Sequence, residues 1–105
     1  MSREYDLALR IDGNNLLSTG LWPVINRKEC KRVKFIFSLD SDWKKKSKKA
    51  IGFQTGKHEE YVPMLNDTCV LPMELLTGEP ILIIAVGEDM GGERIITNSV
   101  EVKVK

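Results

Sequence analysis

Large apolar residues alternate with other residues along much of the chain, which is the pattern of β-strands with one buried face. Residues 32–39 show it best, with apolar side chains at every second position: Val33, Phe35, Phe37 and Leu39. Residues 6–11 and 100–104 repeat the same period of two. A continuous apolar run over residues 81–86 indicates a central strand. The pattern therefore predicts a chain dominated by strands.

Shorter segments between turn signals complete the strand prediction. Further strands are expected at residues 22–25, 50–54, 59–65, 69–71 and 94–97. Pro23 places the first of these at a sheet edge, because proline cannot donate a ladder hydrogen bond. Helix is expected only over residues 72–76, where Pro72 suits the first helical position and Gly78 ends the segment.

These elements define the expected fold class. About seven to nine short strands with one short helical turn and frequent turns predict an all-β protein, an antiparallel β-sandwich. Almost no helix is left to cross between parallel strands. The sequence has no internal repeat or linker, and its 105 residues suit one core. We therefore expect a single β-sandwich domain over residues 1–105.

Composition narrows the function classes. Sixteen Lys and Arg against fifteen Asp and Glu give a net charge of +1. A general nucleic-acid binder is clearly basic, so we expect no nucleic-acid partner. The longest apolar run, residues 81–86, is far shorter than the ~20 residues that cross a bilayer, and no signal peptide is visible. We expect no membrane association and a cytoplasmic origin.

Residues that carry chemistry are few. His58 is the one histidine, too little for a His-rich metal site. Cys30 and Cys69 are too few for a disulfide scaffold and are expected to be reduced thiols. The spacing of Asp40 and Asp42 does not indicate a converging catalytic pair. We therefore expect no catalytic residues, no metal, no cofactor and no enzymatic activity.

The order of features in the second half is more specific than any single motif. A Phe-rich strand leads to Asp42-Trp43, and Lys-Ala-Ile-Gly-Phe follows at residues 49–53. Then come Asn-Asp-Thr-Cys-Val-Leu-Pro-Met-Glu-Leu-Leu at 66–76, an apolar strand ending in Val86-Gly87, and Arg-Ile-Ile-Thr at 94–97. In this order the chain resembles the small immunoglobulin-like β-sandwich module of tail and baseplate structural proteins from phages and prophages of Gram-positive bacteria.

The resemblance covers roughly residues 7–104 and implies a function. It implies a non-enzymatic structural or adaptor module that acts by protein–protein association in virion assembly, in the bacterial host cytoplasm and then in the virion tail. Other tail or baseplate proteins are the implied partners, and rotational symmetry makes a homo-oligomer an open alternative. The chain departs from the family at residues 44–46, Met73 and Asn98, where the family has Gly, an aromatic residue and Thr.

A cluster of five lysines is the strongest local anomaly: Lys44, Lys45, Lys46, Lys48 and Lys49. One interpretation is a contact for a polyanion or for a partner, such as teichoic acid, nucleic acid or an acidic protein. The other is a solvated loop whose charges keep strand edges from pairing. The sequence leaves both open.

Aromatic residues support a second function class. Trp22, Trp43 and Tyr61 could form a platform for sugar rings, which makes a carbohydrate-binding module recognising a cell-surface glycan the alternative function. Trp43 follows a strand end, where a large side chain can plug the sandwich, so we expect it to be buried. Trp22 and Tyr61 stay candidates for an interface or a glycan contact. The edge near Trp22-Pro23 and the strand 100–104 are candidate contacts for association with copies of the chain or with other tail proteins.

Overall fold

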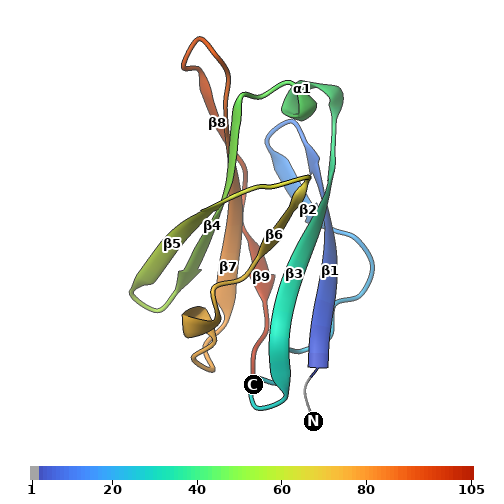
Figure 1. Cartoon of the computed structure of the whole chain (residues 1–105), viewed down its shortest axis with the longest axis vertical. Coiled ribbons are helices and arrows are strands. Elements are labelled where there is room, and N and C mark those ends of the chain that lie inside the picture. Colours follow the sequence, from blue (N-terminus) through green and yellow to red (C-terminus); the bar gives the residue numbers. More distant parts are fainter. Residues whose placement is uncertain (1–2) are drawn as a thin grey trace.

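The computed structural model describes residues 3–105 and shows two β-sheets packed against each other (Figure 1). In spatial order, the first sheet contains β2 (Asn15–Ser18), β1 (Arg3–Asp12), β3 (Cys30–Leu39) and β6 (Thr68–Val70). The second contains β5 (His58–Pro63), β4 (Lys48–Thr55), β7 (Ile81–Glu88) and β8 (Arg94–Ile96), with β9 (Val100–Val102) also paired to β7. The prediction of an all-β sandwich is confirmed.

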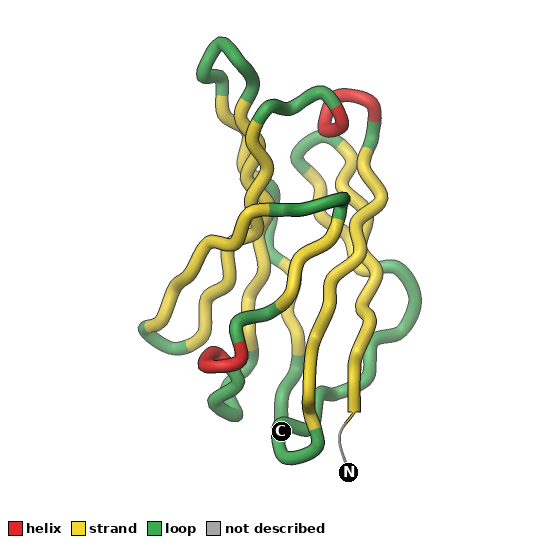
Figure 2. Tube along the Cα trace, in the orientation of Figure 1, coloured by secondary structure: helices red, strands yellow, loops and turns green. Residues whose placement is uncertain are grey.

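Two short helical segments accompany the strands, α1 (Ser41–Lys44) and the 3-10 turn η1 (Met73–Leu75) (Figure 2). The turn η1 lies within the predicted helical segment, with Pro72 just before it. The helix α1 was not predicted, because its four residues are too few for a helical period to be visible.

The core lies between the inner faces of the two sheets. The ring centroids of Phe35 on β3 and Phe53 on β4 are 5.4 Å apart, so the two sheets touch through these aromatic side chains. Cys69 and Leu71, two residues apart, are both buried in this core. The strand β7, predicted as central, pairs with β4 on one edge and with β8 and β9 on the other.

One strand pair departs from the antiparallel expectation. β1 and β3 are parallel neighbours over nearly their whole length. Parallel strands need a long crossover, which is usually a helix. Here β2 and the irregular segment 19–29 together provide the connection, and Ile25 in that segment forms a parallel bridge with Val104, just beyond β9 of the second sheet. The absence of a predicted helix was therefore no evidence against a parallel pair.

The predicted strand at residues 22–25 is wrong. Only Ile25 forms a β-bridge, and the rest of the segment is loop. Pro23 lacks an N–H, and Trp22 bonds through its side chain: its Nε1 donates to the carbonyl oxygen of Ala8 at 3.2 Å. The β2 strand was not predicted, because its four residues show no alternation of apolar and polar side chains. Only Leu16 of the four is buried.

Trp43 joins the two sheets at the α1 end of the molecule. Its side chain is fully buried, as predicted, and its Nε1 donates to the carbonyl oxygen of Gly13 in the β1–β2 turn at 2.6 Å. Its ring lies against Gly87 on β7, where an added Cβ would be 2.8 Å from Cζ3 of Trp43. Trp43 therefore needs glycine at residue 87 of the opposite sheet.

Asp40 holds the same junction together from the polar side. Its carboxylate accepts hydrogen bonds from the backbone N–H groups of Trp43 at 2.8 Å and Gly13 at 2.7 Å. The first bond is the N-cap of α1. These bonds stabilise the ionised form and lower the pKa of Asp40 below its usual value.

The segment between β8 and β9 connects the sheets at one side. Thr97 follows the last residue of β8. Its side-chain Oγ1 accepts a hydrogen bond from the backbone N–H of Ala85 at 2.9 Å, in place of a backbone carbonyl. The side chain of Asn98 reaches the other sheet and forms two bonds with the backbone of Leu16 on β2, at 2.8 and 3.0 Å. The Asn98 side chain therefore links the two sheets.

We expect the Asn98→Ala variant to be less stable than the wild type by about 1–3 kcal/mol, because two backbone groups of Leu16 lose their partner. Urea denaturation followed by tryptophan fluorescence measures the change. The neighbouring variant Ser99→Ala removes an exposed hydroxyl and should stay within about 0.5 kcal/mol of the wild type. Equal stability of the two variants would contradict the proposed role of Asn98.

The lowered pKa of Asp40 predicts an acid-dependent loss of stability. A carboxylate whose pKa is depressed by folding stabilises the protein above its unfolded pKa of about 3.9, and this contribution disappears as the pH falls through the folded pKa. Asp40→Asn should therefore lose less stability than the wild type between about pH 5 and pH 2. Urea denaturation at each pH tests this, with Asp6→Asn on the exposed side of β1 as the matched control.

Candidate interaction surface

The described residues offer little for catalysis or metal binding. Between residues 3 and 105, no three His, Cys, Asp or Glu residues lie close enough to hold a metal ion. No helix in this part of the chain is long and apolar enough to span a membrane.

The two cysteines, Cys30 and Cys69, are free thiols that lie far apart. Cys69 lies opposite Phe35 on β3. Phe35 is five residues along that strand from Cys30, which is about 17 Å at ~3.3 Å per residue. Burial raises the pKa of Cys69 to about 12, which keeps this thiol protonated and unreactive.

The five lysines of the cluster do not form one patch of positive charge. Lys44 belongs to α1, Lys45 and Lys46 follow it, and Lys48 and Lys49 begin β4. This corrects the expectation that the β4 strand starts at residue 50.

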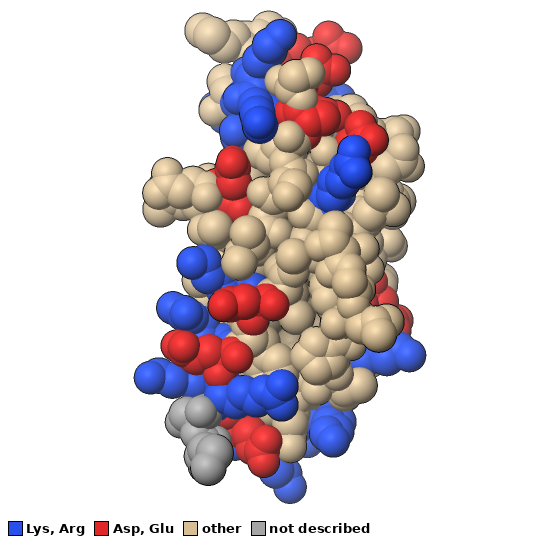
Figure 3. Space-filling view, turned by 90° about the vertical axis from the view of Figure 1, so that its right-hand side faces the viewer, with Lys and Arg blue, Asp and Glu red and all other residues tan. Residues whose placement is uncertain are grey.

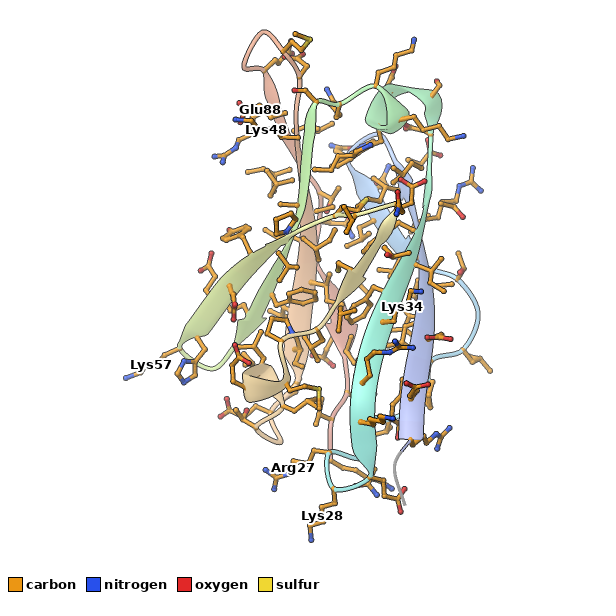
Figure 4. All side chains as sticks on the ribbon, in the orientation of Figure 1. Arg27, Lys28, Lys34, Lys48, Lys57 and Glu88 are labelled. Carbon is orange, nitrogen blue, oxygen red and sulfur yellow. The ribbon has the colours of Figure 1, made fainter. Side chains whose placement is uncertain are left out.

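Acidic side chains lie among these lysines. Lys48 pairs in register with Glu88 on β7, and Figure 4 shows the two side chains next to each other. Lys45 and Lys46 line a hollow together with Asp42 and Asp89. At the upper end of Figure 3, a group of blue side chains lies directly beside a group of red ones. The cluster therefore has mixed charge, although whether it contacts a polyanion stays a prediction.

The three aromatic candidates lie apart. Trp43 is inside the core. Trp22 lies in the loop after β2, beside Ala8 on β1 and 6.4 Å from Phe35 between ring centroids, where it covers one edge of the core. Tyr61 lies on β5, at the opposite side of the molecule from that loop (Figure 1). The three therefore form no shared platform for a sugar.

The outer face of the β2-β1-β3-β6 sheet carries paired charges, and we call it the charged face. Glu4 on β1 and Arg32 on β3 form an ion pair with a 3.5 Å N–O distance, and Asp6 and Lys34 are the next neighbours in register. Opposite charges alternate over the lower part of the side shown in Figure 3. Directly opposed unlike charges are the favourable arrangement on a solvated sheet, so this face suits water.

The outer face of the second sheet is different, and we call its centre the apolar face. Its members are seven side chains from four strands: Ala50, Tyr61, Pro63, Leu82, Ile84, Val86 and Ile96. Tyr61 and Ile96 each expose about half of their surface, 51% and 53%. Contiguous apolar surface of this kind on a sheet face is typical of an interaction site.

Glycine gives this face its shape. The ring of Tyr61 lies over Gly52 on β4, where an added Cβ would be 2.7 Å from Cε1 of Tyr61 and 2.9 Å from Cγ1 of Ile84. A hollow of about 460 Å³ lies on the Ala50 side of Tyr61, and one of about 140 Å³ on the Gln54 side. The carboxylate of Glu59 accepts from the hydroxyl of Tyr61 and raises the pKa of that hydroxyl. The face therefore offers a raised ring between two hollows.

Sequence reasoning missed this face, although one signal pointed to it. Residues 81–86 are apolar at every position, so β7 has apolar side chains on both faces. Such a strand is expected to be covered on both sides. In this structure the core covers only the inner side, which leaves Ile84 and Val86 partly exposed on the outside. Of the predicted contact residues, Tyr61, Lys48 and Lys49 lie on or beside this face.

Comparison with known proteins gives one informative result. The fold is similar to that of the N-terminal domain of phage TP901-1 ORF48. The superposition has a TM-score of 0.59 at 12% sequence identity, and it covers 97% of this chain and 98% of that domain. No family model matches the sequence, and no curated protein matches it. The likeness shows a shared fold across both chains from end to end.

The mixed charge around the lysine cluster predicts no special affinity for polyanions. We expect the triple variant Lys44→Ser, Lys45→Ser, Lys46→Ser to elute from a heparin column at the same salt concentration as a control variant that loses three lysines elsewhere. The control carries Lys28→Ser, Lys31→Ser and Lys34→Ser, so both variants change net charge equally. Earlier elution of the first variant alone would contradict this and support a polyanion contact.

Proposed function

We propose that this chain is a non-enzymatic structural or adaptor module of a phage or prophage tail or baseplate, and that it acts by protein–protein association. It is made in the cytoplasm of the bacterial host and then becomes part of the virion tail. Other tail or baseplate proteins are its partners.

The apolar face is the observation that carries the proposal. Each sheet of the sandwich already buries its inner face in the core, so folding alone gives no reason for a second apolar surface. Side chains such as Tyr61 and Ile96 lose water contact only when another molecule covers them. The fold leaves this face open on regular strands, which suits association with a protein surface.

The fold supports a role in a phage. The N-terminal domain of phage TP901-1 ORF48 has the same fold from end to end, and the order of sequence features resembles tail and baseplate modules. The groups with shifted pKa values have structural explanations: Asp40 caps α1, burial accounts for Cys30 and Cys69, and Tyr61 bonds to Glu59. These shifts therefore need no catalytic role.

Carbohydrate binding gains no support from the aromatic residues, because Trp22 and Tyr61 are on opposite sides of the molecule. Contact of either one with a glycan stays a prediction.

Immunogold electron microscopy of purified phage particles tests the function directly. Antibodies against this chain should label the tail, and mass spectrometry of the same particles should detect the protein at a fixed ratio to the major tail protein. A protein that is expressed in the host but absent from purified particles would contradict the proposal. Particles lacking the gene provide the control for antibody specificity.

A further inference from the structure

We propose that the apolar face binds a second copy of this chain, with the two sheets stacked and their strands running in opposite directions. The proposal rests on the proposed function and names the occupant of its interaction surface. The observation behind it is the order of charged and apolar residues along the strands. Because of this order, the face is complementary to a second copy of itself that is related to it by a two-fold axis.

Strand register arranges the outer side chains of this sheet in four rows across the strands. The first row is charged and contains Lys48, Glu88 and Arg94. The second row contains Pro63, Ala50, Val86 and Ile96, and the third contains Tyr61, Gly52 and Ile84. The fourth row contains Glu59, Gln54, Leu82 and Glu101. Two apolar rows thus lie between a row of two cations and one carboxylate, with net charge +1, and a row with two carboxylates.

A two-fold axis between the faces and perpendicular to the strands exchanges these rows. The first row of one copy then lies opposite the fourth row of the other, and the second lies opposite the third. Each strand faces its own counterpart, and β8 faces β9, because both pair with the same edge of β7. Arg94 therefore meets Glu101 of the second copy, and Lys48 lies diagonally from Glu59. All four side chains are exposed. Within its own chain, Glu59 also accepts from the Tyr61 hydroxyl, and Lys48 and Arg94 both have Glu88 as their register neighbour.

The apolar rows fit one another in the same arrangement. Tyr61 of one copy lies opposite Pro63 of the other, beside the larger hollow that Ala50 and Val86 line. At the centre, Ala50 of one copy lies opposite Gly52 of the other, which the ring of Tyr61 covers. A small side chain thus faces a ring, and the sheets can approach to the usual ~10 Å. In each copy, the Tyr61 ring thus faces the larger hollow of the other copy.

The size of the face suits an association that depends on concentration. Four strands ~4.8 Å apart and seven residues at ~3.3 Å each give about 400–500 Å² per copy. The total of about 800–1,000 Å² is at the lower end of specific interfaces. The monomer and the dimer should therefore both be populated in solution, and charge should shift their ratio.

Sedimentation equilibrium over a range of protein concentrations tests the proposal by charge reversal. The wild type should dimerise, and Arg94→Glu or Glu101→Arg should each raise the dissociation constant at least about tenfold, because like charges would then meet twice in each dimer. The double variant R94E/E101R restores opposite charges across the two-fold axis and should dimerise nearly as well as the wild type. Circular dichroism and thermal unfolding check that each variant is folded.

Lys34→Glu on the charged face is the matched control, because it reverses one partly exposed cation on the other sheet (Figure 4). It should leave the dissociation constant unchanged. A wild type that remains monomeric at millimolar concentration would overturn the proposal, as would a dimer that R94E and E101R leave intact, or one that the double variant does not recover. Virion labelling is independent of these results, so failure of the dimer and failure of the tail function are distinguishable.

Discussion

The contact between Trp43 and the two sheets determines how the rest of the molecule is arranged. Its indole N–H binds the β1–β2 turn at Gly13, and its ring lies against Gly87 of the opposite sheet. Asp40 positions the same turn and the start of α1 through two backbone hydrogen bonds. Because one buried side chain contacts both sheets, their inner faces are held together and their outer faces keep a defined orientation.

The two outer faces then differ in what they can do. The charged face pairs unlike charges such as Glu4 and Arg32 within the chain, so its electrostatic interactions are largely satisfied internally. The apolar side chains of the other face have no covering partner within the chain, and its charges lie at its two ends. Glu88 is the register neighbour of both Lys48 and Arg94, whereas Arg94 and Glu101 are too far along the edge to meet within one copy. A module with one satisfied and one unsatisfied face is suited to assembly through a single surface.

The strands with clear alternation were predictable, whereas elements that depend on distant partners were not. The alternation in β3 and the apolar run in β7 are local properties, and the structure confirms both. The 22–25 segment has strand-like residues but bonds mainly through the Trp22 side chain to β1. The parallel pairing of β1 and β3 arises from a loop that crosses to the second sheet, for which the sequence has no periodic signal.

The sequence by itself determined the fold class, the burial of Trp43 and the central position of β7, because hydrophobic periodicity and side-chain size act locally. Only the tertiary structure decided which surface is available for association. Arg94 and Glu101 are seven residues apart, and they lie on one edge because Thr97 and Asn98 interrupt the strand while both halves stay paired with β7. Cross-strand register creates the rows of the apolar face, and register depends on hydrogen bonds between segments distant in sequence.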